Sequence, residues 1–569
     1  MNKLFIFLSA TLCIAASSIS YAQDAATGDQ PAYDKAIEAI SPSSEKLGIS
    51  LAGATTVDIS RYILASNNGA QNAQISPNGQ QIAFQWSITG RPQLWLIPTH
   101  GGQPKQLTFG NGISFFRWTP DGQSFVYGAD NDGNEQEAYY RITADGNKET
   151  LLLAAKTGAF RQFGDFIDND NIAYTSTERT GLDFDIYVTN TNTQASDMIY
   201  VAKYAFAVNA VSPNGRYVVI SETVGEDSDN LYLFDRQTQD MKTISKPTRR
   251  ANHTSGGIVW RSDSAAFYLA SNLARNYAAV MLYTLDSSFS LIHDSSVDIE
   301  QVRLCGKNNE FLVFAENKGG YNEIKIKHLQ TNKFIDAPKI PEGVYSISCA
   351  KNSDEMAITV DGWKTPGNIY AWNVVSGKLV RSFQAQLAGI AESTLIKPTS
   401  IEIPARDGVL LQGLLYMPSA ETIKQAKPPI LFRVHGGPTS QSRPTYRPSA
   451  QYLVARGIAV FLPNVRGSTG FGHTYVTLDD RENRLDSIRD LVDMLKFFET
   501  HGKVDTKRAA VAGSSYGGYA VNAVLANFPG NFAVGVSMYG VADWVTALKY
   551  ASPALKAIRR QLAWPGRDN

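Results

Sequence analysis

The feature that most constrains the fold is a repeat of roughly 44 residues that runs from residue 60 to residue 385. Its clearest copies carry a Pro-Asn-Gly or Pro-Asp-Gly turn followed by a short apolar run, and they lie at residues 76–79, 119–122 and 212–215. Weaker copies start at Asp168, Arg261, Cys305 and Cys349. Proline fixes φ, and glycine accepts positive φ, so each turn is typical of a connection between two strands.

Four short strands in about 40–45 residues form one blade of a β-propeller, and seven copies predict seven blades over residues 60–385. An array of separate β-sandwich domains is the alternative, and the regular spacing without linkers disfavours it. Four histidines occur singly in the repeat, without the spacing of metal ligands: His100, His253, His293 and His328. No C-x-x-C pair is present, and we therefore expect no metal and no cofactor.

The N-terminus has the pattern of a cleavable secretory signal. Lys3 precedes an apolar run at residues 4–16, and small residues lead to Ala22. This predicts a signal peptide at 1–22, an N-terminal extension at 23–59, and a periplasmic or secreted mature protein. Cys305 and Cys349 occupy equivalent repeat positions, and both a disulfide and a pair of buried thiols remain open.

The charge composition excludes one class of partner. The chain has 53 basic and 53 acidic side chains, so nothing in its net charge favours nucleic acid. The densest basic run, residues 246–250, is interpreted as a solvated loop. No segment after the signal is apolar enough to predict a membrane span.

After residue 395 the pattern changes from repeated strands to alternating strands and helices. Short apolar runs at residues 430–434, 458–462 and 508–512 predict buried strands, and helical spacing between Leu485 and Phe498 predicts a helix that ends at Gly502. Alternation of this kind predicts a mainly parallel sheet with crossover helices. We assign residues 396–569 to a partial α/β-hydrolase domain.

The third of these strands runs into Gly-Ser-Ser-Tyr-Gly at residues 513–517. A strand before this motif and a helix after it are the context in which G-x-S-x-G presents a nucleophilic serine. The motif therefore predicts Ser515 as a nucleophile, with the backbone N–H of Tyr516 beside it. The alternative is a glycine-rich turn required only for packing.

A tetrahedral oxyanion needs a second N–H donor, which in this fold comes from a loop after an earlier strand. Residues 435–438, His-Gly-Gly-Pro, lie directly after the run 430–434. His435 belongs to this loop and precedes the nucleophile, so we do not interpret it as the general base. A further glycine-rich loop at residues 464–472 is expected to line the same site.

The α/β part of the chain contains three motifs: His-Gly-Gly-Pro, Asn-x-Arg-Gly-Ser-Thr-Gly-x-Gly and Gly-x-Ser-Tyr-Gly-Gly-Tyr. Together with the signal and the propeller, they resemble the prolyl oligopeptidase family of serine peptidases. The resemblance is strongest to its acylaminoacyl-peptidase and dipeptidyl-peptidase-like bacterial members. The resemblance implies that Ser515 is acylated and that Tyr516 and Gly437 donate backbone N–H groups to the oxyanion. It also implies short peptides as substrates, because the family's propeller screens them by size.

One part of the pattern is missing. A serine nucleophile in this fold is followed by an acid and then by a histidine, yet no histidine follows Ser515. By analogy with the fold we expect that about 100 residues are lacking at the C-terminus and that this polypeptide has little peptidase activity. An esterase using the same serine, and a non-catalytic propeller binding protein, are the competing hypotheses.

Overall fold

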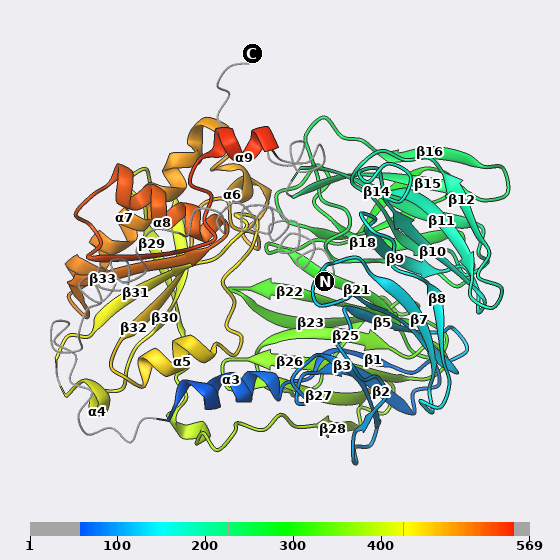
Figure 1. Ribbon diagram of the computed structural model, residues 1–569, viewed down its shortest axis with the longest axis horizontal. Coiled ribbons are helices and arrows are strands. Elements are labelled where there is room, and N and C mark those ends of the chain that lie inside the picture. Colours follow the sequence, from blue (N-terminus) through cyan, green and yellow to red (C-terminus); the bar gives the residue numbers. More distant parts are fainter. Residues whose placement is uncertain (1–56, 226, 425, 551–569) are drawn as a thin grey trace, which may run out of the picture.

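The computed structural model describes residues 57–225, 227–424 and 426–550 (Figure 1). The predicted signal peptide and most of the predicted N-terminal extension lie outside these residues. A β-propeller and an α/β domain lie side by side in the view of Figure 1. No helix among the described residues is long and apolar enough to cross a membrane.

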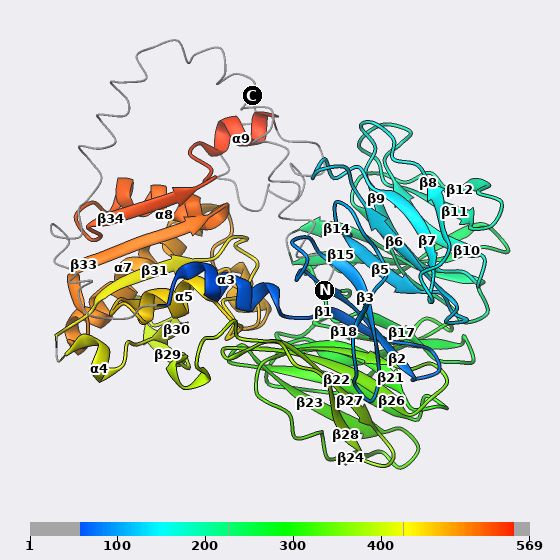
Figure 2. The same ribbon diagram turned by 60° about the horizontal axis from the view of Figure 1, so that its bottom comes forward.

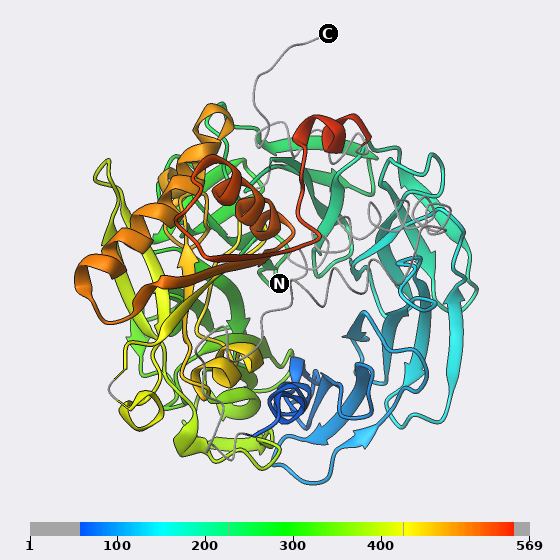
Figure 3. The same ribbon diagram turned by 60° about the vertical axis from the view of Figure 1, so that its left-hand side comes forward.

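The propeller contains seven four-stranded antiparallel sheets, which confirms the predicted number of blades. Each blade uses four consecutive strands, and the blades form a ring (Figure 3). Blades 1 to 3 contain β1 Gln71–Ile75, β2 Gln81–Trp86, β3 Gln93–Pro98 and β4 Lys105–Gln106; β5 Phe115–Trp118, β6 Ser124–Ala129, β7 Ala138–Thr143 and β8 Glu149–Leu153; β9 Arg161–Phe166, β10 Asn171–Ser176, β11 Asp185–Asn190 and β12 Ser196–Tyr200.

Blades 4 to 7 continue the same order along the chain. They contain β13 Phe206–Val211, β14 Tyr217–Gly225, β15 Ser228–Asp235 and β16 Asp240–Ser245; β17 Ile258–Trp260, β18 Ala266–Ser271, β19 Ala279–Thr284 and β20 Ser288–His293; β21 Ile299–Cys305, β22 Phe311–Lys318, β23 Tyr321–His328 and β24 Lys333–Ile335; β25 Val344–Cys349, β26 Glu355–Gly362, β27 Thr365–Asn373 and β28 Leu379–Phe383.

The predicted turns connect the first and second strands of their blades. In blade 1 the Gly79 amide donates to the Ser76 carbonyl at 2.9 Å, and Gly79 has φ +75°. The predicted start of the propeller at residue 60 lies inside helix α3, Ile59–Asn67, and the first strand of blade 1 starts at Gln71. The N-cap of α3, Asp58, accepts a hydrogen bond from the Ser60 amide at 2.8 Å, and the helix buries Tyr62 and Ala65.

The ring closes by packing of blade 7 against blade 1, without a strand shared between the two sheets. Hydrogen bonds supplement this packing, such as the 3.1 Å bond from the Ile75 amide to Ser348 Oγ. Cys305 at the end of β21 and Cys349 at the end of β25 form a disulfide, with Cα atoms 5.2 Å apart. Of the two states left open by the sequence, the structure therefore has the bonded one, which connects blades 6 and 7.

The α/β domain is built on a six-stranded sheet with the order β29-β30-β32-β31-β33-β34. β32, β31, β33 and β34 run parallel, as predicted, and the β29–β30 hairpin adds two strands at one edge. The strands are β29 Thr399–Pro404, β30 Leu410–Tyr416, β31 Pro429–Val434, β32 Ala459–Asn464, β33 Asp505–Ser514 and β34 Val534–Met538. The helices are η1 Glu392–Thr394, α4 Ala420–Ile423, α5 Pro448–Val454, α6 His473–Thr477, η2 Arg481–Asn483, α7 Arg484–His501, α8 Tyr516–Asn527 and α9 Trp544–Tyr550.

Helices cover both faces of this sheet. On one face α7 and α8 bury apolar side chains against Phe432 and Phe461. On the other face α5 packs against β30 and β32, and α3 lies beside α5 (Figure 2). The helix predicted from the spacing of Leu485 to Phe498 is α7, and it ends at Gly502, as predicted. The structure adds that Gly502 has the left-handed conformation.

The α/β domain contacts blades 5 to 7 of the propeller. The contacts lie at the end of each blade where its innermost strand begins. Arg443 of the α/β domain pairs with Glu300 at 2.8 Å and donates to the Gly320 carbonyl at 2.8 Å. The Gly472 amide donates to Asp298 at 2.9 Å, and Arg250 pairs with Asp480 at 3.0 Å. These contacts place the loops after β31 and β32 against the propeller.

Candidate active site

Ser515 lies at the sharp turn between β33 and α8 and has φ +57° and ψ −123°. This conformation is strained for a residue with a side chain, at a cost of about 1–3 kcal/mol, and such strain is concentrated at functional sites. A Cβ on Gly513 would lie 2.4 Å from the Gly517 carbonyl, and one on Gly517 would lie 2.3 Å from the Val434 carbonyl oxygen. Both glycines are therefore required for backbone to pack on backbone beside Ser515.

The loop at residues 435–438 lies next to the serine. A Cβ on Gly436 would be 3.4 Å from the Ser515 Cβ and 3.8 Å from its Oγ. The Ser515 amide donates to the Met538 carbonyl at 3.1 Å, whereas Tyr516 is the first residue of α8. The first amides of a helix have no acceptor within it, and they point their N–H dipoles at groups before the helix. The turn thus brings Ser515, the start of α8 and the loop containing Gly437 together.

His435 is bound on both sides of its ring by groups other than Ser515. Its Nδ1 lies 2.7 Å from the Gly436 carbonyl oxygen and its Nε2 lies 3.0 Å from Ser468 Oγ. Burial lowers the pKa of His435 from 6.5 to about 4. The imidazole is therefore neutral near pH 7, and it connects the loop after β31 to the loop after β32.

We predict that this histidine makes the stability of the α/β domain depend on pH. Because the folded pKa lies below the unfolded value, the contribution is fully present above pH 6.5 and is lost as the pH falls through about 4. Between pH 7 and pH 5 the expected loss is about 2 kcal/mol. His435→Gln should reduce the difference in unfolding free energy between these pH values, measured by urea denaturation. An equal difference in the variant and the parent would contradict the assignment.

A buried polar cluster holds the Tyr516 side chain. Its hydroxyl lies 2.9 Å from Ser487 Oγ and 3.4 Å from Asp479 Oδ2, and it accepts from Arg484 Nη1 at 3.1 Å. Arg484 also forms an ion pair with Asp479. Gly467 packs directly on this carboxylate, since a Cβ there would lie 2.4 Å from it. The orientation of Tyr516 is thereby coupled to the loop after β32.

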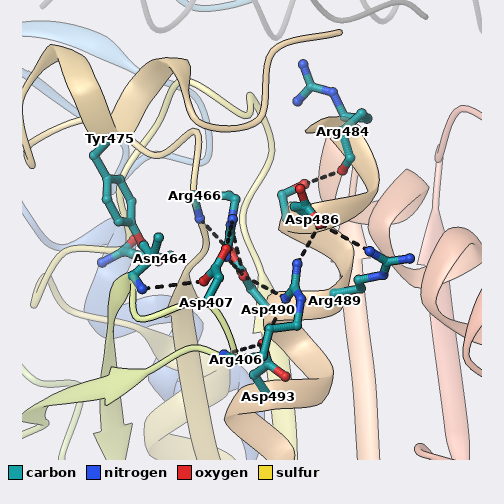
Figure 4. Close-up of polar contacts among 12 residues, drawn as sticks. Arg406, Asp407, Asn464, Arg466, Tyr475, Arg484, Asp486, Arg489, Asp490 and Asp493 are labelled. Carbon is teal, nitrogen blue, oxygen red and sulfur yellow. Dashed lines mark hydrogen bonds and ion pairs between the residues drawn. The ribbon is translucent and has the colours of Figure 1, made fainter. Parts of the chain in front are cut away.

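A second set of charged side chains holds the loop after β32 (Figure 4). Arg466 donates through Nε and Nη2 to Asp490 at 2.8–3.0 Å, and its own amide donates to that carboxylate at 3.0 Å. Its Nη1 and Nη2 also donate to Asp407 at 2.8 and 3.1 Å. These bonds lower the pKa of Asp407 to about 2 and raise that of Arg466 above its ordinary value.

The sequence predicted that the loop at residues 464–472 lines the site, and the structure shows two different roles along it. Ser468 contacts His435, while Arg466 forms a buried ion pair with Asp490. Asp479, Arg484 and Asp490 were not predicted. In the sequence, such residues can be recognised as charged side chains at helix or turn positions that the hydrophobic spacing places toward the core.

The location of all seven histidines is described, and none is hydrogen-bonded to Ser515. His473 lies close to the loop of residues 435–438. It lines a small cleft with Pro438 and Thr439 on one side and with Arg250 of the propeller on the other. Asp543 caps α9 by accepting from the Val545 and Thr546 amides at 3.0 Å.

Comparison with known proteins gives consistent matches to both domains. Residues 444–566 match the model of the prolyl oligopeptidase family, and residues 112–383 match the model of the prolyl oligopeptidase N-terminal beta-propeller domain. Together the two matches span more than two thirds of the chain.

Curated relatives match over most of the chain at low identity. Dipeptidyl aminopeptidase BIII of Pseudoxanthomonas mexicana is 24% identical over 542 residues, which cover 89% of this chain and 75% of the relative. The uncharacterized peptidase YuxL of Bacillus subtilis (strain 168) is 23% identical over 513 residues, covering 83% and 73%. Among solved structures, a puromycin hydrolase has the same fold with a TM-score of 0.74 and 15% identity, covering 87% of this chain and 81% of that one.

Proposed function

This chain belongs to the prolyl oligopeptidase family of serine peptidases, and from that premise we propose that it hydrolyses short peptides through an acyl-enzyme on Ser515. The observation that carries the proposal is the strained turn at Ser515, with the Gly436 backbone packed beside its Oγ. Such a turn exposes a serine to a substrate carbonyl, and the adjacent glycines leave room for it.

Two backbone amides are proposed as oxyanion donors. Tyr516 begins α8, so its N–H has no acceptor within that helix. Gly437 lies in the loop directly after Gly436 and has φ +125°, a conformation that favours glycine. Donors fixed in this way stabilise negative charge on a tetrahedral intermediate without reorganising. The cluster around the Tyr516 hydroxyl supports the first donor by holding its side chain.

The polypeptide of residues 1–569 is proposed to be impaired as a peptidase. Acylation of serine needs a base that takes its proton, and in this fold the base is a histidine positioned by an acid. His435 is engaged by Ser468 and Gly436, and no hydrogen bond joins another described histidine to Ser515. The candidate serine is therefore proposed to have an oxyanion site but, among the residues that the structure describes, no histidine placed to accept its proton.

The propeller and the leader support two further proposals. A propeller packed over the candidate site through the Arg443–Glu300 and Arg250–Asp480 pairs would limit substrates to short peptides. The apolar run at residues 4–16 supports export to the periplasm or beyond.

A reactive serine probe tests the assignment of the nucleophile. We expect a fluorophosphonate to form a covalent adduct on Ser515 at a rate that rises with pH, because hydroxide can accept the serine proton. Ser515→Ala should abolish the adduct, and Ser514→Ala, the matched change one residue earlier, should retain it. Peptide mapping by mass spectrometry identifies the site. An adduct that survives in Ser515→Ala would refute the proposal.

A further inference from the structure

A cavity of about 510 Å³ lies between blades 5 and 6 of the propeller. Three turns line it: residues 261–263 between β17 and β18, residues 308–310 between β21 and β22, and residues 328–330 between β23 and β24. Its most buried lining residues are Tyr268 and Leu304, which are 6% and 7% exposed and belong to the core between the two blades. Cavities of about 300–1,000 Å³ are typical of sites for small molecules.

The turns that line the cavity are held in place by neighbouring blades. The Lys307 amide donates to Asp354 of blade 7 at 2.9 Å, and the disulfide between blades 6 and 7 lies directly before the same turn. On the other side of the cavity, the Asn214 amide of blade 4 donates to Ser264 Oγ at 3.1 Å. Because these walls are fixed before a ligand arrives, binding there requires little further ordering of the protein.

Several polar groups on the lining have unused hydrogen-bonding capacity. The Tyr268 hydroxyl, on a side chain more than nine-tenths buried, has no hydrogen-bond partner among the residues that the structure describes. Glu310 accepts from the Asn308 amide through Oε2 at 2.9 Å, which leaves Oε1 available. His328 accepts from the Thr331 amide through Nδ1 at 3.3 Å, so its Nε2 carries the hydrogen and is a donor.

Three side-chain amides add to these groups. Asn308, Asn309 and Gln330 line the cavity, and within residues 57–225, 227–424 and 426–550 their side chains form no hydrogen bond. Each amide offers an acceptor oxygen and two donor hydrogens. The lining therefore presents donors and acceptors side by side, and not a surface of one kind.

The charges on the lining disfavour an ionic ligand. Arg261 forms an ion pair with Asp263 at 2.6 Å, and both side chains belong to the turn after β17. An incoming anion would meet the carboxylates of Asp263 and Glu310, whereas a cation would meet the guanidinium group of Arg261. A neutral ligand avoids both repulsions, and hydroxyl groups suit mixed donors and acceptors because each hydroxyl is both.

We propose that this cavity binds a neutral polyhydroxylated ligand with the size of one or two sugar rings. The Tyr268 hydroxyl, the free oxygen of Glu310 and the neighbouring amides would bond to its hydroxyl groups. Leu304 and Leu329 provide apolar surface for the C–H face of a ring. A free sugar and the sugar units of a polysaccharide share this chemistry.

The proposed site is separate from Ser515. The α/β domain contacts the opposite ends of these two blades, at Asn276 in the β18–β19 loop and at Glu300 near the start of β21. The cavity lies at the turns after β17, β21 and β23, so the strands of the propeller separate it from those contacts. Sugar binding there does not depend on the proposed peptidase function.

Isothermal titration calorimetry of the full chain with cellobiose and with chitobiose tests the site. We expect the parent to bind at least one of the two disaccharides. Tyr268→Phe, which removes only the hydroxyl, and Gln330→Ala should each raise Kd about fivefold, because each removes about one hydrogen bond. The matched controls are Tyr283→Phe, which removes another buried hydroxyl of blade 5, and Gln237→Ala, which removes an exposed amide at the β15–β16 turn. Both controls should keep the Kd of the parent.

A second measurement identifies the source of the sugar. Retention of the chain on cellulose or chitin that the soluble disaccharide reverses would support the sugar units of a polysaccharide as the ligand. Binding of the disaccharide without such retention would support a free sugar. A parent that gives no binding heat with either disaccharide, or a Kd that is unchanged in both Tyr268→Phe and Gln330→Ala, would overturn the proposal.

Discussion

The polypeptide of residues 1–569 is expected to cleave a short peptide on the order of 10⁴-fold more slowly than dipeptidyl aminopeptidase BIII of Pseudoxanthomonas mexicana assayed in parallel. Losing one member of a serine triad removes the general base, and what remains is acceleration by the oxyanion donors and by binding. His435 cannot replace that base, because Ser468 holds its Nε2 at 3.0 Å and burial lowers its pKa to about 4. The measurement is kcat/KM on dipeptide and tripeptide nitroanilides.

Ser515→Ala supplies the baseline for this comparison. If the base is missing, the parent and Ser515→Ala should have nearly equal rates on peptides. Added imidazole should accelerate the acylation of the parent by a reactive ester and leave Ser515→Ala unchanged, because free imidazole can accept the serine proton. Peptide turnover by the parent at the rate of the relative, lost in Ser515→Ala, would show that another group of this chain acts as the base.

Much of the fold follows from local patterns. The Pro-Asn-Gly turn at residues 76–79 determines the first connection of a blade because proline and glycine fix its dihedral angles, and its recurrence gives the number of blades. The propeller was predicted to start at residue 60, but residues 59–67 form a helix that buries Tyr62 and Ala65 at helical spacing, and the first strand of blade 1 starts at Gln71. The sequence does not decide the state of the two cysteines, because equivalent repeat positions are compatible with a bond and with two thiols.

The candidate site, too, could be predicted from the sequence only in part. The motif around Ser515 could be placed from the sequence, since its glycines are needed for contacts within a few residues. The partners of Arg466 could not be predicted from the sequence, because they are distant along the chain. Asp407 lies 59 residues away in the β29–β30 hairpin, and Asp490 lies 24 residues away on α7. Side-chain pairs of this kind depend on how β30, β32 and α7 pack, which no local pattern encodes.

This arrangement gives the prediction with the second largest effect. Asp490→Ala should lower the free energy of unfolding of the α/β domain by about 3–5 kcal/mol, because it leaves the buried Arg466 guanidinium without its main partner. Asp407→Ala removes the other partner of Arg466. Because the Asp407 side chain is 41% exposed, this change should lower the free energy of unfolding by about 1 kcal/mol or less. Urea denaturation followed by circular dichroism, with hydrogen exchange of α7 to locate the effect, measures both.

The decisive quantity is the difference in unfolding free energy between Asp490→Ala and Asp407→Ala, since both aspartates bind Arg466 and they differ in burial. Asp490 also accepts from the Arg466 amide at 3.0 Å, so its loss should loosen the loop that carries Ser468 and, through it, His435. We therefore expect Asp490→Ala, and not Asp407→Ala, to increase hydrogen exchange in residues 465–468 and to slow fluorophosphonate labelling of Ser515. Equal destabilisation by the two changes would mean that the charge of Arg466, and not the burial of its partner, determines the stability of this loop.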